Sequence, residues 1–279
     1  MATTTERASL DHRPRNDGGR KIGEWTAKAW PSVAVLIGVL VVWEVIVEVR
    51  DVSEFVIAKP TEIAQETIDS QELLIEATWV TTQEILYGFL ISVATGVVIA
   101  VALTRFDWLH RAVYPLIVLF QVVPKVALAP IFILWFGYGL GPKLLLIVVI
   151  AFFPVALNML VGLKNVDKDL IWLMRSVGSS HNQILTRIQI PTSLPYLFAG
   201  MRIAITLSVI GAVVAEFSGA QNGLGFLIQF ASTQLDTPLM FAALTLVSLL
   251  GLVLYYAISL VELALGRQFP HIRTATHPM

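Results

Sequence analysis

Cysteine is absent from this chain of 279 residues, and charged residues are scarce. Without cysteine the chain has no disulfides, no thiolate catalysis and no metal site built on thiolates. Only 14% of the residues are charged, against about a quarter in a typical soluble domain. The net charge of −1 gives no basic excess for binding nucleic acid. With a mean hydropathy of +0.75, the chain is expected to be an integral membrane protein.

The sequence also lacks the usual motifs of soluble enzymes. It contains no G-x-x-x-x-G-K-[ST] phosphate loop, since "GYGLGPK" at residues 137–143 has its glycines and lysine in another order. The five histidines have no metal-ligand spacing, and none lies in the middle of an apolar run to serve an intramembrane serine as a base. We therefore assign no ATPase site, no metal, no bound cofactor and no catalytic residue to this chain.

Apolar runs of bilayer length dominate the sequence. A helix needs about 20 mainly apolar residues to cross a bilayer. Six such spans are predicted, at residues 30–49, 85–103, 112–136, 144–163, 196–217 and 238–262. The third contains Pro115, Pro124 and Pro130, so we expect it to be kinked or broken, because each proline removes a helix hydrogen bond. The expected fold class is an all-α polytopic membrane protein.

The basic residues predict the orientation of these spans. Residues 1–28 are polar and aperiodic and read as a disordered tail rather than a signal peptide. If this tail is cytoplasmic, the segments on its side of the membrane hold 14 of the 19 Lys and Arg residues. The opposite segment 50–83 has two basic residues against seven acidic ones. The positive-inside rule thus places both termini, including a second tail at 271–279, in the cytoplasm.

The loop between the fourth and fifth spans, residues 164–195, is the most polar part of the second half of the chain. A short helix from about residue 168 is predicted by an apolar stripe at positions i, i+3, i+4 and i+7, which are Leu170, Leu173, Met174 and Val177. Gly178 is expected to end this helix, since glycine tolerates the positive φ found just past a helix C-terminus.

A second short helix is predicted directly after this glycine. Ser180 and Gln183 have the spacing of a capping box. One face of the helix carries Ile184, Leu185 and Ile188, and Pro191 is expected to stop it. The pattern alone fits two interpretations equally: a docking element for another protein, or an interfacial hairpin that packs on the protein's own spans.

A resemblance favours docking. Gly178, with Ile188, Ile190 and Pro191 at the matching spacings, resembles the signature cytoplasmic loop of ABC importer permeases. The stretches "VVPKVALAPIFILWFGYGLGPK" and "LPYLFAGMRIAITLSVIGAVVAEFSGAQNGLGFLI" are also similar to the nitrate, sulfonate and taurine type of binding-protein-dependent permease. The resemblance covers about residues 30 to 270. It implies the type I importer arrangement of six transmembrane helices, with the loop as a short cytoplasmic coupling element.

The chain departs from the family pattern at one informative place. The family has Glu-Ala-Ala where this chain has Trp172, Leu173 and Met174. The carboxylate that a partner's basic residue would bind is therefore missing, and we expect an apolar contact through Trp172 instead. The residues expected to dock the ATPase are Leu170, Trp172, Leu173, Met174, Val177, Gly178, Ser180, Gln183, Ile188 and Pro191.

The resemblance implies the partners and the role. Two copies of the chain would form the passage in the plasma membrane of a prokaryote. Two cytoplasmic ATPase subunits, which use ATP and Mg, would drive it, and an extracytoplasmic binding protein would deliver the solute. Relatives of this type carry nitrate, sulfonates, taurine, pyrimidines or other vitamin precursors. The alternative is an ion-coupled secondary transporter, which should show internal inverted repeats, and no convincing repeat is present.

Polar residues inside spans are the candidates for contact with solute, because burying them in a bilayer is costly. Lys125 and Glu216 are predicted either to pair with each other or to place one charge on the passage. The amides of Gln121 and Asn158 are weaker candidates, since a buried amide commonly joins helices. The other two charges within spans, Glu44 and Arg202, lie near span ends, where snorkelling to the surface is expected.

Overall fold

The computed structural model describes residues 18–268, in which every regular element is a helix. The chain divides into two units at Val52 and Ser53. The first contains helix α1 (Gly18–Val49), which includes the predicted span 30–49. Helix α1 begins before residue 28, so the end of the predicted tail is helical. Residues 1–17 and 269–279, with the rest of the two predicted tails, lie outside the described residues.

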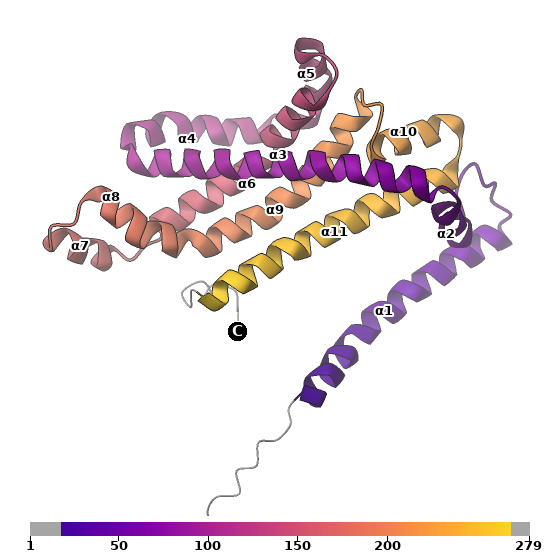
Figure 1. The fold of residues 1–279 in the computed structure, drawn as a ribbon, viewed down its shortest axis with the longest axis horizontal. Coiled ribbons are helices and arrows are strands. Elements are labelled where there is room, and N and C mark those ends of the chain that lie inside the picture. The colour runs from indigo at the N-terminus through magenta and orange to yellow at the C-terminus, as the bar shows by residue number, and fades with distance from the viewer. Residues whose placement is uncertain (1–17, 269–279) are drawn as a thin grey trace, which may run out of the picture. The chain divides into compact units, whose positions relative to one another are not determined.

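The second unit contains the other helices, which Figure 1 labels in chain order. They are α2 (Pro60–Asp69), α3 (Gln71–Arg105), α4 (Asp107–Val122), the 3₁₀ helix η1 (Lys125–Leu128), α5 (Ala129–Phe136), α6 (Leu140–Lys164), α7 (Lys168–Ser176), α8 (His181–Ile184), the π-helix η2 (Leu185–Gln189), α9 (Ile190–Phe217), α10 (Leu224–Gln234) and α11 (Thr237–Gln268). Helix α3 is much longer than the predicted span at 85–103.

The centre of the second unit is a three-helix layer of α3, α6 and α9, which run side by side in Figure 1. Glycines bring these helices together. A Cβ atom on Gly96 of α3 would lie 2.7 Å from the Cβ atom of Val155 on α6, and one on Gly200 of α9 would lie 2.8 Å from the carbonyl oxygen of Pro154. Such close approach needs small residues at helix interfaces.

Helices α3 and α6 run in the same direction. Gly88 contacts Ile147 and Gly96 contacts Val155, so both registers increase together. The chain must therefore return across the bundle between them, and α4, η1 and α5 make this return. We call the end of the bundle where α3 and α6 finish the α7 end, and the opposite end the α10 end.

The returning segment is bent by 90° between α4 and α5, which confirms the predicted break in the third span. Pro124 precedes η1, and Pro130 occupies the first turn of α5, where the missing N–H group costs no helix hydrogen bond. Because this segment joins the two ends of parallel helices, it counts as one broken crossing. Together with the five long apolar helices, it gives six candidate spans.

Candidate functional site

Helix α7 forms a short, free-standing element at the α7 end. The carboxylate of Asp167 caps its N-terminus by accepting a hydrogen bond of 2.9 Å from the backbone N–H of Asp169. Most of the predicted apolar stripe is solvent-exposed within the second unit, with Val177 70% exposed, while Met174 is half-buried. Trp172, beside the stripe, is also 70% exposed. An apolar surface this open, outside the membrane-crossing helices, is typical of a protein contact.

The corner after α7 has the predicted geometry. Gly178 adopts a φ of +80°, which ends the helix. The backbone N–H of Ser179 donates to the carbonyl of Met174, closing the turn at 2.9 Å. Ser180 and Gln183 then form the predicted capping box, in which the Ser180 N–H donates to the Gln183 amide oxygen at 2.7 Å.

The second part of the loop anchors this corner to the bundle. Ile184 and Leu185 are buried, and Leu185 packs with Leu163 at the end of α6. The side-chain amide of Gln189 donates to the carbonyl of Leu163 at 3.1 Å. Helix α7 is therefore held at a fixed corner from an anchored helix, with Ile188 half-buried in the anchor.

The prediction that Pro191 stops this second helix is wrong. The chain remains helical from His181 to Phe217, because the π-helix η2 leads directly into α9. Pro191 lies in the first turn of α9. We attribute its tolerance to the wider i→i+5 turn before it, which changes the hydrogen-bond register at the position where proline has no N–H group to donate. The corner is thus rigidly continuous with a membrane-crossing helix.

Two of the predicted passage residues, Gln121 and Lys125, lie together at the bend between α4 and α5. The Lys125 ammonium donates to the backbone carbonyl of Gln121 at 3.3 Å and lies 4.9 Å from the centre of the Phe153 ring. It lines a cavity of about 560 Å³ whose other walls are apolar side chains from α3, α4, α5 and α6. The cavity offers one cation and aromatic faces, a combination that suits an anionic or aromatic molecule.

The side chain of Asn158 bonds within its own helix. Its side-chain amide donates at 2.8 Å to the carbonyl of Pro154, one turn earlier in α6. The amide therefore satisfies its own helix rather than joining two helices. This bond lies directly under Gly200 of α9, whose backbone closely approaches both residues.

Glu216 is buried at the end of α9 and does not pair with Lys125. One carboxylate oxygen accepts a hydrogen bond of 2.7 Å from the Thr81 hydroxyl, and the other accepts one of 2.6 Å from the Gly225 N–H. Thr81 in turn accepts a bond of 2.8 Å from the Leu224 N–H. The predicted Lys125–Glu216 pair is wrong, because Glu216 instead joins α3 to the first turn of α10.

Comparison with known proteins identifies the chain. Residues 92–267 match the family of binding-protein-dependent transport system inner membrane components. The chain belongs to this family. It is 36% identical to the formylaminopyrimidine transport permease ThiX of Halalkalibacterium halodurans, over 80% of this chain and 89% of that one. It is 28% identical to the taurine transport permease TauC of Escherichia coli, over 80% of this chain and 84% of that one.

A solved structure shares the fold of this permease. The inward-facing MetNI methionine ABC transporter matches with a TM-score of 0.54 at 20% identity, covering 68% of this chain and 98% of that one. The resemblance seen in the sequence is thus confirmed, and with it the role of permease subunit in a binding-protein-dependent ABC importer. The alternative of an ion-coupled secondary transporter is not favoured.

The permease contains two ion pairs that the sequence did not reveal. Lys143 of α6 donates to the Glu84 carboxylate of α3 at 2.5 Å. Arg202 of α9, which we expected to snorkel, pairs with Glu262 of α11 at 3.1 Å. Glu84 and Lys143 each lie one residue outside a predicted span. This shared position next to a span is the signal in the sequence from which the Glu84–Lys143 pair could have been predicted.

Proposed function

We propose that the permease acts as one half of a solute passage and that α7 is the surface on which a cytoplasmic ATPase subunit docks. The observation that carries the proposal is the exposed apolar face of α7, fixed by the Gly178 corner to a helix that continues into α9. A movement of α7 by the docked ATPase is then transmitted to α9, because the helix that follows the Gly178 corner continues through η2 into α9 without a break.

The charge distribution supports a cytoplasmic position for the α7 end. This end carries the basic residues Arg105, Lys164, Lys168 and Arg175. The α10 end instead carries helix α2, whose charged residues are all acidic. Basic residues gather on the cytoplasmic side of membrane proteins. Reporter fusions after Asp69 and after Asn165 should therefore report opposite sides, with the second in the cytoplasm. The same side for both fusions would contradict the proposed topology.

The docking surface is tested by copurification of the ATPase subunit with the full-length permease. Replacing Trp172 and Leu173 by serine removes much of the exposed apolar face and should release the ATPase. The matched control is Phe55→Ser, which changes an aromatic residue of similar exposure, 68% against 70% for Trp172, outside the α7 end. Retention of the ATPase by the α7 variant would refute the docking role.

Trp172→Glu gives a second test, because it restores the carboxylate of the family pattern. A docked ATPase with a basic residue at this place should tolerate the change, since a charged pair replaces an apolar contact. We therefore expect copurification to persist in Trp172→Glu and to be lost in the double serine variant.

For the passage, we propose that two copies of the chain enclose it and that the cavity at Lys125 faces it. The solute we propose belongs to the range of its relatives: nitrate, sulfonate, taurine or a pyrimidine or other vitamin precursor. Lys125 and the Phe153 ring support a solute with an anionic group or an aromatic ring. A thermal-shift screen of the cognate binding protein against these classes identifies the solute.

A further inference from the structure

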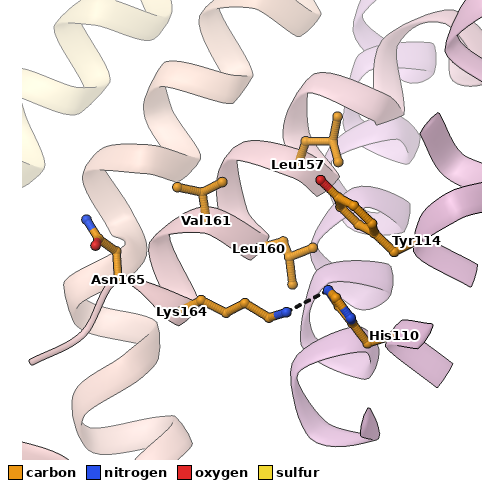
Figure 2. A pocket seen from close by; sticks show the side chains of 7 residues that line it. All are labelled: His110, Tyr114, Leu157, Leu160, Val161, Lys164 and Asn165. Carbon is orange, nitrogen blue, oxygen red and sulfur yellow. Dashed lines mark hydrogen bonds between the residues drawn. The ribbon is translucent and has the colours of Figure 1, made fainter. Parts of the chain in front are cut away.

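A second cavity, of about 630 Å³, lies between α4 and α6 at the α7 end (Figure 2). We call it the α4–α6 hollow. Its apolar wall on α6 is made of Leu157, Leu160 and Val161. Its polar groups come from His110, Tyr114, Lys164 and Asn165. None of the functions described above uses these side chains.

The charged group of the hollow is the hydrogen-bond donor Lys164, while the Asn165 amide already donates to the Tyr196 hydroxyl at 2.6 Å. The Lys164 ammonium lies 2.6 Å from Nε2 of His110, as the dashed line in Figure 2 marks. An ammonium has no acceptor, so Nε2 accepts this bond and Nδ1 carries the ring hydrogen. The Tyr114 ring stacks on His110 at 5.1 Å and holds it in place. Lys164 keeps two N–H groups, and no Asp or Glu is among the described residues that line the hollow, so the hollow suits an anion.

The position of the hollow along the helices places the donors at the level of lipid headgroups. Lys164 is the last residue of α6, and Arg105 is the last residue of α3. Trp108, in the first turn of α4, is 69% exposed. Tryptophan and tyrosine gather at membrane surfaces, where the apolar layer meets the headgroups. The apolar wall of the hollow is on the bilayer side of Lys164, one to two turns back along α6.

We propose that the α4–α6 hollow binds the phosphate group of an anionic phospholipid. Lys164 and His110 donate to the phosphate, and Leu157, Leu160 and Val161 contact the upper part of an acyl chain. Basic pockets between membrane helices bind such headgroups in general. The combination of donors at one end and an apolar wall at the other matches an amphipathic lipid better than a small soluble anion. Because α4 leads into the bend at Lys125, a lipid here also contacts the segment that crosses the bundle.

The test is a binding titration of the purified full-length permease with dioleoylphosphatidylglycerol, using dioleoylphosphatidylcholine as the uncharged comparison. We expect the wild type to prefer phosphatidylglycerol. Lys164→Met should weaken that binding about tenfold or more, as expected for the loss of a charged hydrogen bond. Lys164→Arg should retain most of the affinity. The matched control is Lys168→Met, which removes an exposed charge from α7 outside the hollow and should leave the affinity unchanged.

Several outcomes would overturn the proposal. One is a wild type that binds both lipids equally, and another is an equal loss in Lys164→Met and Lys168→Met, which indicates diffuse attraction. Competition by inorganic phosphate at concentrations comparable to the lipid identifies a soluble-anion site instead. Unfolding curves in phosphatidylcholine verify that each variant folds. Should Lys164→Met fail to fold, His110→Phe keeps the ring stack, removes one donor and should still weaken lipid binding.

Discussion

The carboxylate of Glu216 is predicted to be a major stabilising contact at the α10 end. In Glu216→Ala, the Gly225 N–H and the Thr81 hydroxyl both lose their acceptor in a buried site. An unsatisfied buried donor costs about 1–3 kcal/mol, so the two together predict a loss of roughly 2–6 kcal/mol. The assay is unfolding of the purified permease in mixed micelles by a denaturing detergent, followed by circular dichroism.

A matched control exists on the same helix. Ser208 is as deeply buried as Glu216, but its hydroxyl donates only to the Ala204 carbonyl of its own helix. Ser208→Ala removes the donor itself and orphans no other group, so we expect a change of at most about 1 kcal/mol. If Glu216→Ala costs no more than Ser208→Ala, the anchoring role of Glu216 is refuted. In a double-mutant cycle, Thr81→Val and Glu216→Ala should be coupled by roughly 1 kcal/mol or more.

Three further predictions concern coupling, solute contact and the ion pair. Gly178→Val should insert normally but lower solute-stimulated ATP hydrolysis, because a positive φ strains any other residue by about 1–2 kcal/mol; Gly141→Ala, in a regular helix, should not change it. Lys125→Met should reduce uptake of an anionic solute about tenfold or more, and equal uptake would exclude contact. Arg202→Met and Glu262→Met should each destabilise the permease in detergent unfolding, and the double variant should cost less than the sum.

The parts of the fold that the sequence predicted depend on neighbours within a few positions. The stripe of α7, the Gly178 corner and the Ser180–Gln183 capping box all follow from spacings of at most seven residues. The break in the third span follows in the same way from its prolines. Such local rules hold here because the loop lies outside the bilayer, where few tertiary contacts override them.

Contacts between distant residues could not be predicted in this way. Glu216 was matched with Lys125 because their charges are opposite and both lie in spans. Its real partner Thr81 is a neutral residue 135 positions away, just before a predicted span. The first-turn N–H groups of α10 also need an acceptor, and a backbone requirement of this kind is invisible in a list of charged side chains. Opposite charge alone is therefore not sufficient to predict which side chains pair inside the bundle.

The limits of the second and fourth spans show the physical reason most clearly. Both predicted spans begin one residue after a charge, Glu84 in α3 and Lys143 in α6, because a single charge in a bilayer is costly. The two helices nevertheless run through these positions, since the two opposite charges form an ion pair at 2.5 Å. This pair can form only because α3 and α6 are parallel and in register, as Gly88 and Ile147 one turn further on demonstrate. Hydropathy evaluates each charge alone, so it ends a span where a paired charge permits the helix to continue.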